Sequence, residues 1–148
     1  MNNYGFNREQ RSKFNYWFAH WCAFQMVALC LHIWKPKYLF HDIEKPWLRL
    51  FLPYKKVQKI HRKFNRHHEQ WLERHNHIPV DIDALIIDNE CSRFTKQAAT
   101  LTALQYFNKK LSECEQKISN QQADQLVYKY QALYNSAINR AKQLGLDE

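Results

Sequence analysis

The sequence predicts an all-α protein, a compact bundle of about five helices. Only two glycines and four prolines occur in 148 residues, too few for the many tight turns of a β-sandwich or a β-barrel. Apolar residues recur three and four positions apart, the spacing that places them on one face of a helix. The length is that of one domain with a core of its own.

The first predicted helix covers residues 9–34 and ends near Pro36, because proline interrupts helical hydrogen bonding. Residues 14–34 contain no Asp, Glu, Lys or Arg and are long enough to span a bilayer. Four polar residues are nevertheless spread along them: Asn15, His20, Gln25 and His32. Since the rest of the chain is amphipathic and needs an apolar partner, we favour a buried core helix over a membrane span.

Prolines set the limits of the next elements. A short second helix is predicted for residues 37–45 and ends at Pro46, and a brief helical piece lies between Pro46 and Pro53. The third predicted helix covers residues 54–76 and ends before Pro79.

The fourth predicted helix begins after Asp81 or Asp83, either of which can cap it, and its pattern allows it to continue past Lys110. The last helix covers residues 120–144, where apolar side chains recur at helical spacing, and Gly145 closes it.

We divide the chain into a helical core, residues 1–110, and a C-terminal helical extension, residues 111–148. The extension either packs on the core or presents a face for a homodimer. Four cysteines lie far apart in apolar helical contexts without a C-x-x-C pair, which favours a reducing, cytoplasmic compartment. We expect no signal peptide, because the opening residues lack its pattern.

The third predicted helix separates into two faces when it is projected at about 100° per residue. His61, Asn65 and His68 fall on an inward face with Val57 and Phe64. Burying one unpaired imidazole or amide costs on the order of 1–3 kcal/mol. A single buried histidine is more often hydrogen-bonded within a core, but three aligned polar groups need a shared partner, and a metal ion would satisfy them all.

His67 projects to the edge of that inward face, so we expect a surface or supporting residue there. Asp88 projects with small residues of the fourth helix and can approach a neighbouring helix closely. The alternative is a carboxylate that is favoured near a helix start by the macrodipole.

His41 and Asp42, in the stretch FHDIEK, would point about 100° apart on a helix, so both can reach one ion. Imidazole and carboxylate ligands suit Mn, Fe, Ni, Zn or Mg in differing degrees. The alternative is a solvated pair of Asp42 with Lys45 three residues later.

Histidine in a first helix, then H-D-x-x-K, then a late aspartate resembles the HD-domain metal-dependent phosphohydrolase superfamily. More closely, H-D-x-x-K followed by H-x-x-x-N-x-H-H-x-x-W is similar to a bacterial and phage family of unknown function that is helical and HD-like. The resemblance covers roughly residues 15 to 108 and implies an HD-like core.

The resemblance also implies a set of ligands for a divalent metal ion: His20, His41, Asp42, His61, His68 and Asp88. Of these, His61 and His68 would be further ligands or would hold the substrate phosphate. His32 is the rival of His20 and otherwise a supporting residue, and Asn65 would orient a ligand. Asp42, Lys45 and His61 are the implied catalytic residues. Glu44 stands where the bacterial and phage family usually has serine. It would either join the ligands or repel a phosphate.

The charge distribution favours a phosphate-bearing partner, because residues 35–74 carry eleven Lys or Arg against four Asp or Glu. The predicted function is hydrolysis of a nucleotide or another phosphate ester. The alternative is a non-enzymatic phage or bacterial protein that binds nucleic acid or an acidic protein. It would use a basic patch on the third helix: Lys55, Lys59, Arg62, Lys63 and Arg66. A merely solvated helix face would have the same composition.

Overall fold

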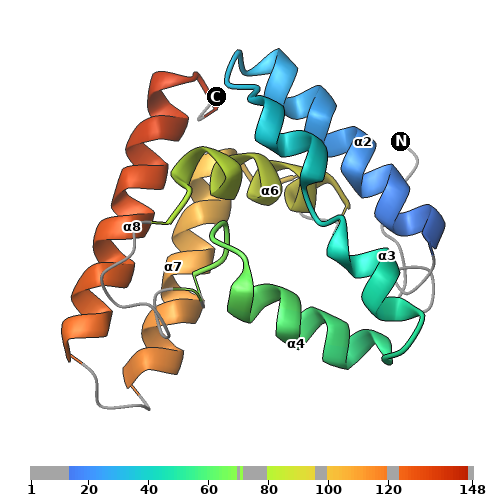
Figure 1. Ribbon diagram of the computed structural model, residues 1–148. Coiled ribbons are helices and arrows are strands. Elements are labelled where there is room, and N and C mark those ends of the chain that lie inside the picture. The colour runs from blue at the N-terminus through green and yellow to red at the C-terminus, as the bar shows by residue number, and fades with distance from the viewer. Residues whose placement is uncertain (1–13, 70, 72–79, 96–99, 120–123, 147–148) are drawn as a thin grey trace.

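The computed structural model describes residues 14–69, 71, 80–95, 100–119 and 124–146. Within them the chain is all-helical, as predicted. The elements in order are α2 (Phe14–Cys30), the 3-10 helix η1 (Pro36–Phe40), α3 (Glu44–Arg49), α4 (Tyr54–Phe64), α6 (Ile82–Thr95), α7 (Ala103–Ser119) and α8 (Asp124–Gln143). Figure 1 shows α7 and α8 side by side, α2 on the opposite side of the molecule, α3 and α4 below α2, and α6 in the centre.

Helix α6 belongs to both parts of the hydrophobic core. Its Leu85 and Ile86 pack with buried residues of α7 and α8, whereas Ala84 and Ile87 pack with buried residues of α2 and η1. The helix is capped by Asp81, whose Oδ1 accepts a hydrogen bond from the backbone N–H of Ala84 at 3.3 Å. Side chains of α6 can therefore contact residues of α2 and η1 as well as residues of α7 and α8.

Helices α6 and α7 are separate, so the fourth predicted helix does not continue past Lys110. The reason is a capping box: Thr102 Oγ1 accepts a hydrogen bond from the backbone N–H of Gln105, and Gln105 Oε1 accepts one from the backbone N–H of Thr102. Helix α7 passes through residue 110, the boundary of the two predicted parts. The division of the chain at that residue stays a prediction.

Helix α2 ends at Cys30, several residues before the proline that was expected to stop it. His32 adopts a left-handed conformation, with φ 55°. Its N–H bonds to Leu29 O, and the N–H of Ile33 bonds to Ala28 O, which is the Schellman pattern of a helix end. No helix among the described residues combines the length and hydrophobicity that crossing a membrane requires.

The prediction of a helix over residues 37–45 is wrong. The chain forms η1, then a turn through His41 and Asp42, and then α3. Asp42 has φ 58°, a left-handed conformation that aspartate tolerates better than most residues. Pro46 lies inside the first turn of α3, where its missing N–H removes no helical hydrogen bond. The proline therefore does not end a helix there.

Three side chains of α2 hold η1 and the following turn in place. The Trp17 indole donates to the Asp42 carbonyl at 2.8 Å, and the Trp21 indole donates to the Leu39 carbonyl at 3.0 Å. The Gln25 amide donates to the Tyr38 carbonyl at 2.6 Å. These donors are four residues apart and so lie on one face of α2. The position of the turn is fixed by contacts far away in the sequence.

Helix α4 is shorter than the predicted helix over residues 54–76, because Asn65 is extended, with φ −89° and ψ 131°. Residues 66–69 form turns, and residues 70 and 72–79 lie outside the described part of the chain. At the other end of the molecule, Gly145 closes α8 as predicted, with φ 67°.

Candidate metal centre

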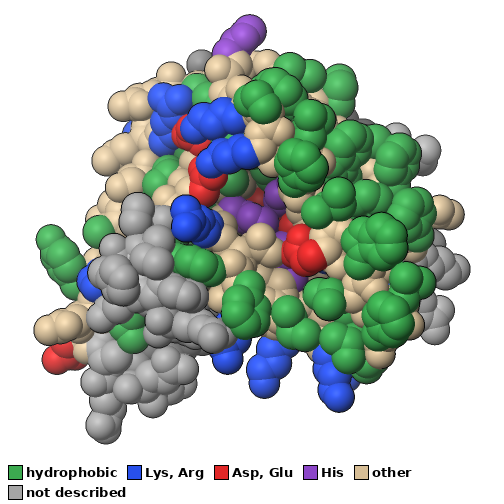
Figure 2. Space-filling model, viewed as in Figure 1, with side chains coloured by type: hydrophobic (Ala, Val, Ile, Leu, Met, Phe, Trp, Pro, Cys, Tyr) green, Lys and Arg blue, Asp and Glu red, His purple; other side chains and the backbone are tan. Residues whose placement is uncertain are grey.

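Five histidines and two aspartates from separate elements converge at the middle of the molecule. They are His20 on α2, His41 and Asp42 in the turn before α3, His61 on α4, His67 and His68 in the turn after α4, and Asp88 on α6. Figure 2 shows histidine side chains on the floor of a hollow in one face, with an acidic side chain beside them. The fold therefore collects side chains that can bind a metal from positions as many as 68 apart in the sequence, from His20 to Asp88.

Asp42 lies between the other ligands, and its side chain is fully buried. Its Oδ2 lies 3.5 Å from Nε2 of His41 and 3.7 Å from Nε2 of His20. Its Oδ1 lies 3.0 Å from Nε2 of His61 and 3.5 Å from Nε2 of His67. The two carboxylate oxygens thus face two different sets of histidines.

The first set consists of His20, His41 and Asp88. Nε2 of His20 lies 3.1 Å from Asp88 Oδ1 and 3.4 Å from Nε2 of His41. Nε2 of His41 lies 3.8 Å from the same Asp88 oxygen. The His41 ring stacks on Phe24, with 3.6 Å between ring centroids, and this contact fixes its orientation.

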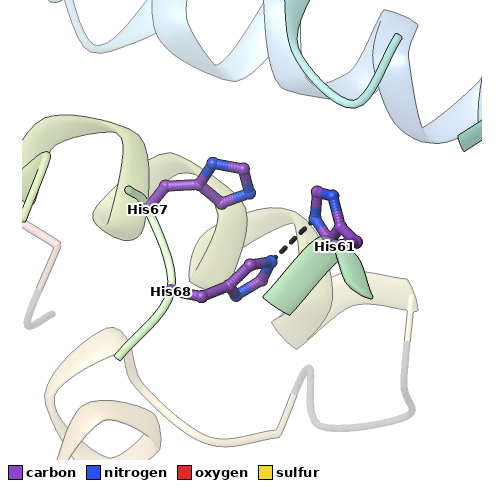
Figure 3. Close-up of side chains that lie close together, drawn as sticks. All are labelled: His61, His67 and His68. Carbon is purple, nitrogen blue, oxygen red and sulfur yellow. Dashed lines mark hydrogen bonds between the residues drawn. The ribbon is translucent and has the colours of Figure 1, made fainter. Parts of the chain in front are cut away.

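The second set consists of His61, His67 and His68. Their imidazole rings point toward one another in Figure 3, and Nε2 of His61 lies 2.8 Å from Nε2 of His68. The ring centroids of His67 and His68 are 4.3 Å apart. Because α4 has already ended, two adjacent residues in a turn can both face the same point.

These separations are those of ligands around an ion. With ligand distances of about 2.0–2.2 Å, neighbouring ligand atoms in tetrahedral or octahedral geometry are about 2.8–3.6 Å apart. Most of the separations around Asp42 fall in or near this range. His67 Nε2 is also buried without a hydrogen-bond partner in the described residues, which is costly unless something binds it. The residues fit a metal ion, and the buried cluster can hold one.

The protonation states suit a cation. Burial opposes the ionisation of Asp42, but its interactions with His41, Lys45 and His61, together with a hydrogen bond to His61, hold its pKa well below the usual value. The pKa of Asp88 is also well below normal: burial opposes its ionisation, but the hydrogen bond with His20 and the interactions with His20, His68 and His67 outweigh burial. Both carboxyls are therefore ionised at neutral pH.

Burial also keeps most of the imidazoles neutral, the form that binds metals. It lowers the pKa of His41, His67 and His68. His61 differs: burial lowers its pKa, but the charge of Asp42 and hydrogen bonds to Asp42 and Glu44 raise it overall. A bound cation would displace that proton.

Glu44 and Asn65 support His61. Nδ1 of His61 bonds to Glu44 Oε1, and the Asn65 side-chain amide donates to the same oxygen. A carboxylate on Nδ1 fixes the tautomer and leaves Nε2 to bind a metal. In the structure Glu44 thus acts on the candidate site through His61. The sequence had suggested that it would either join the ligands or repel a phosphate. Lys45 pairs with Asp42 Oδ2, and its side chain is 18% exposed.

The structure brings together all six ligands that the resemblance implied, but two residues lie elsewhere than expected. His67, expected at the surface or in a supporting position, is buried within the cluster. His32, the rival of His20, is exposed at the end of α2. A second, smaller error concerns Phe64, which was placed on the inward face but is 50% exposed. The differences at His67 and His32 follow from helix ends that lie earlier than predicted. Phe64 still lies within α4, so its exposure does not have this cause.

No protein-family model, curated protein or solved structure matches this chain. The resemblance to the HD-domain superfamily therefore stays a prediction, and the geometry of the cluster is what bears on function.

Proposed function

We propose that the protein is a metal-dependent phosphohydrolase that binds two divalent ions, one on each side of Asp42. The observation that carries this proposal is the placement of two sets of three ligands against the two oxygens of one buried carboxylate. A purely structural ion would need only one closed set of ligands.

The donor types favour a transition metal. Five of the seven candidate ligands are imidazoles, which suit Fe, Ni or Zn, whereas Mn accepts more oxygen donors and Mg prefers oxygen donors and bound water. Of the five metals considered from the sequence, Mg is therefore the least suited to this cluster.

A bound divalent ion would lower the pKa of a water molecule toward about 7 and neutralise phosphate oxygens. In the proposed reaction, the oxygen of one water forms a bond to phosphorus, the ester P–O bond breaks, and the alcohol leaves with a proton. Asp42 holds the two sets of ligands together, and Glu44 orients His61. Lys45 places a positive charge beside Asp42, where it can stabilise the negative phosphate.

Elemental analysis of protein purified without chelators tests the metal. We expect about two equivalents of a transition metal per chain, and less than about a tenth of an equivalent, without gain on reconstitution, would sink the proposal. Hydrolysis needs a separate screen for phosphate release from phosphate esters. His41→Ala should abolish release, and a metal-loaded protein that releases no phosphate from any ester would leave a metal-binding protein that is not a hydrolase.

A second candidate function is binding of nucleic acid or an acidic protein by the basic patch. Its residues are all exposed: Lys55, Lys59, Arg62, Lys63 and Arg66. In Figure 2 basic side chains project from the lower edge, where α4 lies in Figure 1. Binding to a phosphate backbone should weaken steeply between about 50 and 200 mM salt. No binding to DNA or RNA at low salt would remove the nucleic-acid version.

A further inference from the structure

A cavity of about 210 Å³ lies beside the candidate metal centre, between α2, α3 and α4. It shares His20 and Asp42 with the centre, so one end of the cavity is bounded by metal ligands. The volume is far larger than a single water molecule needs. An organic molecule that enters the cavity would therefore lie next to the first set of ligands.

Two cations line the cavity. Lys45 and Arg49 are four residues apart on α3 and so project from the same face of the helix. Lys45 is paired with Asp42, which places it at the metal end, and Arg49 donates to the Leu52 carbonyl at 3.0 Å. Two cations beside a metal centre can bind one phosphate group.

The rest of the wall is mainly apolar and contains four aromatic side chains: Phe14, Tyr16, Trp17 and Tyr54. Flat rings pack well on such side chains in offset or edge-to-face geometry. A ring-free polyol would leave its hydroxyl groups against apolar walls, where they would lose hydrogen bonds to water. The wall thus favours a ligand with a flat ring.

We propose that this cavity binds an aromatic ring of the substrate, and that the substrate is a phosphate monoester of an alcohol bearing such a ring. The proposal rests on the proposed hydrolase function. The phosphate lies at the metal end beside Lys45 and Asp42, Arg49 adds a second positive charge to the cavity wall, and the ring lies among the aromatic side chains. Aryl phosphates and nucleoside monophosphates share this chemistry.

Binding of two phosphonates, which cannot be hydrolysed, tests the ring without relying on activity. Phenylphosphonate and methylphosphonate are titrated into the protein as purified and followed by calorimetry. Since they share the acid group and differ in the ring, we expect phenylphosphonate to bind at least about ten-fold more tightly. Equal affinities would overturn the proposal.

Variants locate the ring. Tyr54→Ser removes one ring from the wall and should reduce the preference for phenylphosphonate by about five-fold or more. The matched control is Tyr128→Ser on α8, because Tyr128 is 74% exposed and does not line the cavity. Leu50→Gln, at a lining residue that is 69% exposed, provides a second variant that leaves the core intact, with Leu29→Gln as its control. An unchanged preference in both cavity variants would refute the assignment.

Hydrolysis then distinguishes the two ring-bearing substrates. kcat/KM is compared for phenyl phosphate, nucleoside 5′-monophosphates and glycerol 3-phosphate, and the better of the first two identifies the source of the ring. Rates for glycerol 3-phosphate equal to the best of them would overturn the substrate class and leave the hydrolase standing. Loss of all hydrolysis would instead overturn the proposed function, and the phosphonate affinities would still report on the cavity.

Discussion

Replacement of Asp42 by asparagine is the most informative perturbation of the cluster. Asparagine has nearly the same shape and, like aspartate, tolerates the left-handed conformation that the turn requires, φ 58°. The change therefore removes the charge and one of two ligating oxygens without forcing the backbone to move. The amide oxygen can face only one set of histidines, and the NH₂ group, which cannot bind a cation, faces the other.

The expected loss follows from the contacts. Each carboxylate oxygen lies within 3.0–3.7 Å of two histidine nitrogens, so both sets lose a charged ligand. Changes in residues that merely support a metal ligand cost about 10–100-fold in affinity. Loss of the shared ligand itself should therefore cost more than about 100-fold at each set, or about 2.7 kcal/mol. The metal content should fall from about two ions per chain to less than about half an ion.

Elemental analysis after dialysis gives the stoichiometry, and two further variants give the comparison. Asp88→Asn affects only the first set and should remove about one ion. Asp83→Asn, on the same helix, changes a carboxylate that pairs with Lys35 at the surface and should leave both ions bound. Full metal content in Asp42→Asn, or a greater loss in Asp88→Asn than in Asp42→Asn, would refute the shared-ligand reasoning.

Two other predictions concern the cluster, and a third concerns the end of α8. Glu44→Gln weakens the support of His61 and should reduce metal affinity about 10–100-fold in a metal titration; an unchanged affinity would contradict that role. Burial lowers the pKa of three ligands: His41, His67 and His68. Below pH about 6.5 these histidines are protonated in the unfolded chain but stay neutral in the folded chain. The free energy of unfolding of the metal-free protein should therefore fall on acidification, by up to about 1.4 kcal/mol per pH unit for each histidine. The raised pKa of His61 acts in the opposite direction, but it is a single histidine opposed by three. Urea unfolding at pH 5.5 should therefore show lower stability than at pH 7. A higher stability at pH 5.5 would contradict the pKa directions. Gly145→Ala should cost about 1 kcal/mol by urea unfolding because of its positive φ alone, since nothing lies within 4 Å of an added Cβ; no loss would mean that the residue has another conformation.

The sequence predicted the features of the fold that depend on local chemistry. The all-helical fold class follows from the spacing of apolar residues along the chain. Gly145 is predicted as a helix end because glycine adopts a left-handed conformation without cost. The capping box of Thr102 and Gln105 is equally local and could have been found by its pattern, T-x-x-Q. The boundary between α6 and α7 was thus missed although its signal is present in the sequence.

The ends of α2 and α4 show a different kind of error. His32 and Asn65 are neither glycine nor proline, yet α2 and α4 end beside them. Asn65 leaves the helix where its amide reaches Glu44, a residue 21 positions earlier. Such a contact exists only in the folded molecule and cannot be read from local sequence. The prediction therefore extends the helix past Asn65 and places His67 at the edge of the inward face.

The turn that contains His41 and Asp42 is the place where local reasoning failed most and where the candidate site lies. On a helix these two side chains would point about 100° apart, and one of them would have to reach back to the cluster. In the left-handed turn Nε2 of His41 and Oδ2 of Asp42 lie 3.5 Å apart and face the same ligands. The unfavourable conformation is maintained from α2, where Trp17 binds the Asp42 carbonyl. Because a helix would have avoided that cost, the turn is best explained by the convergence of ligands that it permits.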